Sequence, residues 1–267
     1  SGDLDVRGGA QVVNIVLKEA NRRTSYAFEI NMDHYHDGKY QPGGKFSATG
    51  LNGRFNYFLS AELEPRWEYR DGFEESLNVD GSLNEIIDRN FGGDSWPTAF
   101  SANLGYEFDE RNIATLNFQL TNNNFLSYAD RMITDLRVDP AAMRVERDET
   151  PTEDESWEIG GDYMHVFENG SRWRTLFIAN EAVTDEVRSR LQIDGNTITK
   201  DLFLSNYLKT QERIVRSSYV FDLNETQSME AGVERAQTIL DTSLQLGLLS
   251  SDLGQNTGGF RFGELRP

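Results

Sequence analysis

The chain has 267 residues and a formal net charge of −18, with 26 Lys and Arg against 44 Asp and Glu. This acidic balance argues against nucleic-acid binding, which needs an excess of Lys and Arg for phosphate contacts. The sequence has no cysteine, which excludes disulfide frameworks, thiolate metal sites and cysteine nucleophiles. No stretch approaches the roughly 18 consecutive apolar residues that a membrane-spanning helix needs.

The dominant pattern along the chain is the alternation of apolar and polar residues. It is clearest in 26–32, 55–63, 100–108 and 114–120, where apolar residues occupy every second position. A period of two is typical of antiparallel strands with one apolar and one polar face. The pattern predicts nine strands, at about 23–33, 44–51, 54–66, 97–108, 112–124, 156–167, 171–187, 202–222 and 227–246.

The connections between these strands alternate between short and long. Turn signals centred at 52, 110, 169 and 224 lie 58, 59 and 55 residues apart. Between them we expect long polar loops at about 66–96, 124–156 and 188–201, and a shorter one near 33–44. Tight turns at one end of a sheet and long loops at the other are typical of outer-membrane barrels.

Two further features favour lipid, rather than a protein core, against the apolar face. Four tryptophans fall near predicted strand ends, where an interfacial aromatic belt would place them: Trp67, Trp96, Trp157 and Trp173. The opposite face carries side chains that need water or a polar filling: Asn56, Glu62, Asn103, Glu107, Asn117, Gln119 and Asp162. The inner side of a large barrel provides such an environment.

The segment 8–18, Gly-Gly-Ala-Gln-Val-Val-Asn-Ile-Val-Leu-Lys, resembles the end of the plug domain of TonB-dependent outer-membrane receptors. Gly8 and Gly9 match the small-residue turn of that motif, Asn14 and Ile15 its signature pair, and Lys18 its basic exit residue. In such receptors the first barrel strand follows directly, and here alternation begins at 25–26.

The resemblance implies an all-β chain in which 1–20 is the end of a plug domain. Residues 21–267 would form part of an antiparallel transmembrane barrel, about nine of a presumed 22 strands, truncated in an extracellular loop. It further implies a receptor in the outer membrane of a Gram-negative bacterium. Such receptors take up a scarce nutrient, for example an iron chelate, a vitamin or an oligosaccharide. The implied partners are the TonB energy-coupling complex, reached through a missing amino-terminal segment, outer-membrane lipid and the unknown ligand.

Two other interpretations remain open from the sequence. One is a smaller, complete outer-membrane barrel that acts as a passive pore or an adhesin. The other is a soluble carbohydrate-binding β-sandwich, in which Tyr57, Phe100 and Phe118 would be buried in a core. Burial of these three rings separates the sandwich from both barrels.

Candidate chemistry is sparse, and we expect neither an enzyme nor a cofactor. The sequence contains no nucleophile elbow, phosphate-binding glycine loop or His-Glu-x-x-His motif. His34 and His36 are weak candidates for a ligand-binding loop, because two imidazoles flanked by Asp33 and Asp37 could contact a metal chelate. We expect the acidic run 149–155 to be a solvated, mobile loop.

The last two predicted strands allow a specific register to be proposed. Matching their polar faces requires paired residue numbers to sum to about 450. Arg216 then lies opposite Glu234 on the inner face, as an opposite-charge cross-strand pair.

Overall fold

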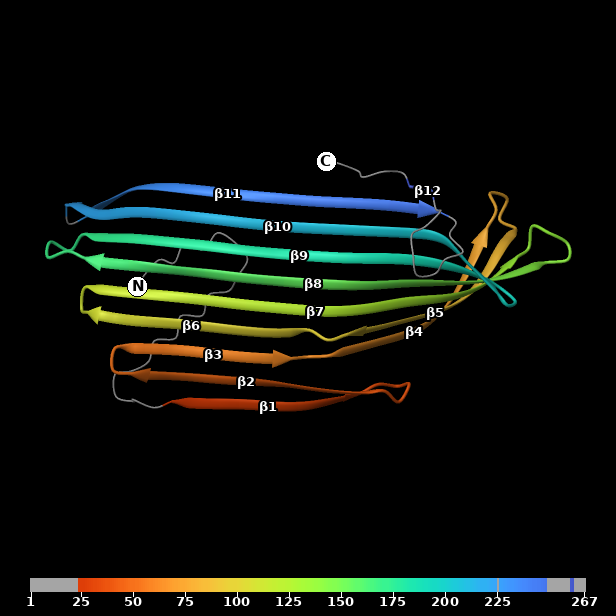
Figure 1. The fold of residues 1–267 in the computed structure, drawn as a ribbon, viewed down its shortest axis with the longest axis horizontal. Helices are drawn as coiled ribbons and strands as arrows, with labels where there is room; N and C mark the ends of the chain where they lie inside the picture. The colour runs from red at the N-terminus through yellow and green to blue at the C-terminus, as the bar shows by residue number, and fades with distance from the viewer. Residues whose placement is uncertain (1–23, 225, 249–259, 262–267) are drawn as a thin grey trace.

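The computed structural model describes residues 24–224, 226–248 and 260–261. These residues form one antiparallel sheet and contain no helix (Figure 1). The strands are β1 (Ser25–His34), β2 (Tyr40–Asn52), β3 (Phe55–Leu63), β4 (Arg66–Leu77), β5 (Leu83–Ser95), β6 (Thr98–Asp109), β7 (Asn112–Asp135), β8 (Ala142–Val166), β9 (Arg172–Asp194), β10 (Thr197–Asn224), β11 (Gln227–Leu248) and β12 (Phe260–Arg261). The predicted all-β, antiparallel class is confirmed. The predicted plug segment 1–20 lies outside the described residues.

The main path of the sheet runs β1-β2-β3-β6-β7-β8-β9-β10-β11-β12. The β4–β5 hairpin lies off this path. β5 pairs with the second half of β7, from Phe125 to Asp135, which is the end away from the tight turns and is called distal below. Within the described residues, β1 pairs only with β2, so the sheet is open and does not close into a barrel.

Tight turns lie at one end of the sheet and long hairpins at the other, as the sequence predicts (Figure 1). Gly53 and Gly170 occupy turns with φ of 63° and 84°, a region that favours glycine because it has no Cβ. The turn between β6 and β7 is closed by Asp109, whose carboxylate accepts a hydrogen bond from the Arg111 backbone N–H at 2.9 Å.

The long connections differ from the prediction, because most of their residues are strand. The expected loop 66–96 is the β4–β5 hairpin, and the expected loops 124–156 and 188–201 are extensions of β7, β8, β9 and β10. The predicted count of nine strands is therefore too low, and the acidic run 149–155 lies in β8 rather than in a loop. These extensions lack the regular apolar alternation used for the prediction, because apolar residues occur on both faces: Ile133 is buried, whereas Leu126 and Met132 are 49% and 40% exposed.

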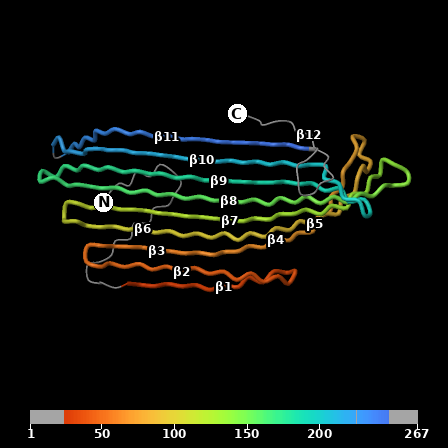
Figure 2. Tube along the Cα trace, in the orientation of Figure 1, coloured from red at the N-terminus to blue at the C-terminus, as the bar shows by residue number. Residues whose placement is uncertain are grey.

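The longest strands, β7 to β10, have 23 to 28 residues. At ~3.3 Å per residue, the 24 residues of β7 extend about 80 Å. Figure 2 shows these strands running side by side along the sheet, with their hairpin tips diverging at the distal end.

The described residues contain almost no hydrophobic core. Only Ala48, Ala129 and Ile133 are buried apolar residues, and the buried polar residues outnumber them. A soluble sandwich would require two sheets packed face to face. The described part of the chain has a single sheet, and Phe100 is 41% exposed while Tyr57 and Phe118 are only half-buried. The sandwich interpretation is therefore wrong for these residues.

The predicted β10–β11 register is confirmed, with Arg216 opposite Glu234. The side chains add a feature that the register alone did not indicate. Arg216 Nη2 lies 3.1 Å from Glu230 Oε1, so the ion pair runs along the polar face to the next acidic residue of β11, four positions from Glu234. The long Arg side chain makes this diagonal reach possible.

Cysteine cross-linking tests this register, because the chain has no native cysteine. We expect the Arg216→Cys/Glu234→Cys variant to form a disulfide under mild oxidation, since directly opposite Cβ atoms are about 4.5–5.5 Å apart. The matched Arg216→Cys/Glu230→Cys variant places its cysteines four strand positions apart and should remain reduced. Non-reducing electrophoresis after proteolysis distinguishes the two, and preferential cross-linking of the second variant would contradict the register.

Candidate functional site

One face of the sheet is mainly apolar along the main path of strands from β1 to β10. Residues paired in the ladder lie on the same face, so the register traces this surface from strand to strand. Phe46 of β2 pairs with Phe28 and Ala61, Ala61 pairs with Phe100, Phe100 with Leu120, and Leu120 with Trp157. The surface continues through Phe177, which pairs with Val215 on β10.

This apolar face is exposed to solvent rather than covered by protein. Phe28, Ile30 and Val233 are 75–84% exposed, and in the middle of the sheet Phe177 remains 40% exposed. Monomeric soluble proteins rarely expose a contiguous apolar surface of this extent, which marks an interface with another protein or with lipid.

The apolar surface forms a band of defined height. On β6 it extends from Phe100 to Phe108, which is about 27 Å along the strand. On β8 the band ends at Trp157, because the next residue on this face is Glu155. On β9 it ends at Ala179, because the next residue on this face is Glu181, which lies opposite Trp157. The nine residues from Phe100 to Phe108 equal the roughly 9–11 that a strand tilted by about 45° needs to cross a bilayer.

Aromatic side chains border the band near the tight turns. Ring contacts connect Tyr163 with Trp173 at 5.9 Å between centroids, and Phe167 with Tyr219 at 5.6 Å. Their polar tips are hydrogen-bonded, as when Trp173 Nε1 donates to Ser217 Oγ at 2.8 Å. Rings with one apolar and one polar end are typical of membrane–water interfaces.

The tryptophan prediction is confirmed in part. Trp67 lies near the start of β4, Trp173 near the start of β9, and Trp96 between β5 and β6. Trp157 lies well inside β8 instead of at its end, because β8 continues beyond the band. Its ring nevertheless marks the distal border of the apolar surface.

The opposite face is mainly polar on β3, β6, β7 and β8, and all seven residues predicted for it lie there. On β9 and β10 this face also carries Leu176, Ile178 and Ile214. Asp162 accepts hydrogen bonds from Thr115 and from Arg174, while Ser60 and Ser101 are bonded across β3 and β6 at 2.6 Å. Asn103 lies directly opposite Asn117 in the β6–β7 ladder. The sheet therefore separates an apolar from a hydrated surface over the height of the band.

Beyond the band, charged side chains on the polar face form a connected network. Asp148, only 5% exposed, accepts bonds from Arg131 at 2.6 Å and Arg188 at 3.0 Å. Arg190 makes two bonds of 2.9 and 3.0 Å with Asp201. At the tip of β7, the Arg137 guanidinium lowers the pKa of Asp135 to about 2.

The β1–β2 hairpin is fastened to β4 and β5 by side chains rather than by backbone pairing. Lys39 Nζ lies 2.6 Å from Asp94 Oδ2 and 3.7 Å from the centre of the Trp67 ring. Trp67 Nε1 donates to Asp37 at 2.6 Å, and Gln41 Nε2 donates to Asp94 Oδ1 at 2.5 Å.

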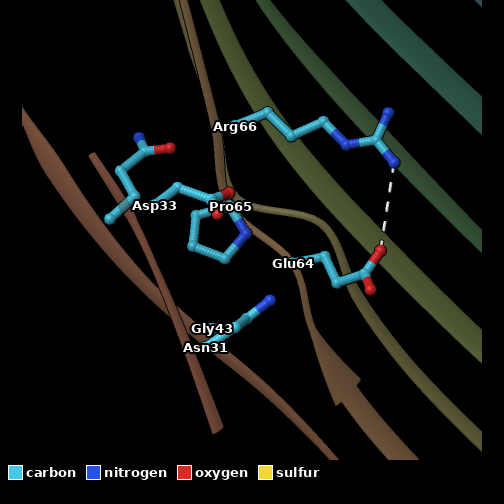
Figure 3. Close-up of a pocket in the computed structure, with 7 residues that line it drawn as sticks. Asn31, Asp33, Gly43, Glu64, Pro65 and Arg66 are labelled. Atoms are coloured by element: carbon cyan, nitrogen blue, oxygen red, sulfur yellow. Dashed lines mark ion pairs between the residues drawn. The ribbon is translucent and has the colours of Figure 1, made fainter. Parts of the chain in front are cut away.

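A polar cavity of about 220 Å³ lies beside this junction. It is lined by Asn31, Asp33, Gln41, Gly43, Glu64, Pro65 and Arg66. In Figure 3, Glu64 and Arg66 reach toward one another across the β3–β4 junction, at an ion-pair distance of 3.9 Å. Nothing in the sequence indicated this cavity, because its walls come from three separate segments.

The structure does not bring His34 and His36 together into a site. The His34 ring stacks on Tyr40 at 4.4 Å, and His36 contacts Tyr69 at 5.7 Å. Among the described residues, no three His, Cys, Asp or Glu side chains cluster as metal ligands. The predicted junction residues Gly8, Gly9, Asn14, Ile15 and Lys18 lie outside the described residues.

Comparisons with protein-family models, with curated protein sequences and with solved structures found no match. Within the described ranges, no helix has the length and apolar character to cross a membrane.

A pair of lysine substitutions distinguishes the two faces. Leu116 lies on the apolar face, opposite Leu104, and its neighbour Asn117 lies on the polar face. In lipid vesicles, we expect Leu116→Lys to lower the free energy of unfolding by about 2–4 kcal/mol, because it places a charge in hydrocarbon. Asn117→Lys should change it by less than about 1 kcal/mol. Equal effects in urea titrations would contradict the assignment of the faces.

The Asp148 network should stabilise the extended hairpins. Asp148→Asn removes the charge shared by two Arg side chains. We expect the free energy of local unfolding to fall by about 1–2 kcal/mol, and the fall should be near the lower value because the Arg188 side chain is 43% exposed. Amide exchange in distal β7 and β8 should then accelerate about five- to thirtyfold. The control is Asp88→Asn, an exposed carboxylate on β5. Equal exchange in both variants would show that the network adds no stability.

Proposed function

We propose that this chain forms wall and outer-loop elements of a TonB-dependent outer-membrane receptor. The observation that carries the proposal is the exposed apolar band on one face of a single-layer antiparallel sheet, with a hydrated face behind it. The plug-like motif at 8–18 supports the receptor family specifically, since a band alone fits any outer-membrane barrel.

In this arrangement, lipid covers the apolar face and the polar face lines the lumen. Tight turns face the periplasm, and the long hairpins of β4–β5, β7–β8 and β9–β10 extend outward. The edge of β1 must pair with another strand, because hydrocarbon offers no hydrogen bond to a free backbone group.

The protein binds a scarce nutrient on its outer hairpins and releases it inward when energy arrives through a periplasmic partner. No bond is broken in this process, and no catalytic group is required. Binding and gating are the only chemistry assigned to the chain.

Energised uptake is the test of this function. We expect cells that carry the gene to outgrow a deletion strain on one member of a panel of iron chelates, cobalamins and oligosaccharides supplied at limiting concentration. This advantage should disappear when the proton-motive force is collapsed or TonB is deleted.

A passive pore gives a different result. It would support uptake that survives both treatments and would produce steady ion conductance in planar bilayers. An adhesin would give neither an uptake advantage nor conductance. Recovery of the protein from a soluble fraction, rather than from outer membranes, would contradict every membrane function.

A further inference from the structure

The cavity between the β1–β2 hairpin and the β3–β4 junction contains acceptor oxygens that have no donor. Gln41 is 1% exposed, and its Oε1 has no hydrogen-bond partner in the described part of the chain. Its amide orientation is fixed, because Nε2 donates to the Asp94 carboxylate and a flipped amide would place oxygen against oxygen. A buried acceptor without a partner costs about 1–3 kcal/mol, so an occupant with positive or donor character is favoured.

Other oxygens converge on the same space. Asn31 Oδ1 is also buried without a partner. A Cβ on Gly43 would collide with this atom and lie 2.9 Å from the Leu63 carbonyl oxygen, so the absence of a side chain at Gly43 opens the space between them. Side-chain amide and backbone carbonyl oxygens are ordinary ligands of hard cations.

The local charges leave one carboxylate unneutralised. Asp94 is paired with Lys39, and Glu64 with Lys45 and Arg66. Asp33 lines the cavity as an exposed residue, and no hydrogen bond or ion pair links its carboxylate to another described residue. A bound cation would meet this charge and the amide oxygens together.

We propose that this cavity binds a hard divalent cation of the Ca²⁺ type through Asp33, Asn31 and Gln41. The ion would join the β1–β2 hairpin to the β3–β4 junction, where the backbone ladder between β2 and β3 ends at Gly44 and Leu63. Such a site does not need three acidic side chains, because Ca²⁺ accepts six to eight oxygens of mixed type, including water.

The experiment uses the full-length protein, purified in detergent and stripped with a chelator. Tb³⁺ alone is the probe, with luminescence excited through the neighbouring Trp67 and with Ca²⁺ as the competitor. We expect saturable luminescence that Ca²⁺ displaces. Asp33→Asn should weaken binding at least about tenfold, since affinity depends on ligand charge. The matched control is Asp88→Asn, an exposed carboxylate of β5 outside the cavity, and it should bind as the unaltered chain does.

A second measurement reports where the ion binds. Adding Ca²⁺ to the stripped protein should slow amide exchange in 31–43 and 63–66, and the effect should be absent in Asp33→Asn. The proposal would be overturned if Tb³⁺ binding did not saturate, or if Asp33→Asn and Asp88→Asn lowered the Tb³⁺ affinity equally. The cavity would then hold water only. Because binding is measured without any nutrient, the result is independent of energised uptake.

Discussion

The structure depends on one constraint: a single-layer sheet has two faces, and no layer formed by the described residues covers either of them. In water such a sheet has little reason to form, because folding is driven by removing apolar surface from water. Here only three apolar residues of the described part are buried, while Phe, Ile, Leu and Trp side chains line one whole face. Such a face needs a covering of protein or lipid. Its nine residues on β6, Phe100 to Phe108, equal the roughly 9–11 that a tilted strand needs to cross a bilayer.

The same sheet is held together differently beyond the band. There the strands continue without a continuous apolar face, and cross-strand ion pairs add to the few apolar contacts, which include buried Ala129 and Ile133. The Asp148 carboxylate accepts hydrogen bonds from Arg131 and Arg188. Arg190 donates two hydrogen bonds to the Asp201 carboxylate. Long Arg side chains shield these carboxylates from water, which explains how a surface sheet buries Glu146 and Asp148 to 7% and 5% exposure. The result is a set of long hairpins whose strands are connected by charged side chains as well as by the backbone ladder.

The junction between the two regions is where the fold is least regular. β3 leads into β4 through Glu64 and Pro65, and the backbone ladder between the β1–β2 and β4–β5 hairpins is interrupted there. Lys39, Gln41 and Trp67 connect the two hairpins by side chains instead. The interruption leaves a polar cavity with unmatched acceptors, and a bound cation would supply the missing interaction.

The sequence by itself determined the strand class, the four tight turns and the faces of the strands within the apolar band. It also determined the β10–β11 register, because a period-two pattern beside a short turn leaves one alignment of polar faces. Only the tertiary structure showed that 66–96, 124–156 and 188–201 are strands, since no apolar alternation distinguishes a hydrated strand from a loop. It also placed Trp157 at a border inside β8 and paired Arg216 with Glu230. The cavity could not be predicted, because Asn31, Gln41 and Glu64 approach one another only after two hairpins have packed, and no local pattern encodes that contact.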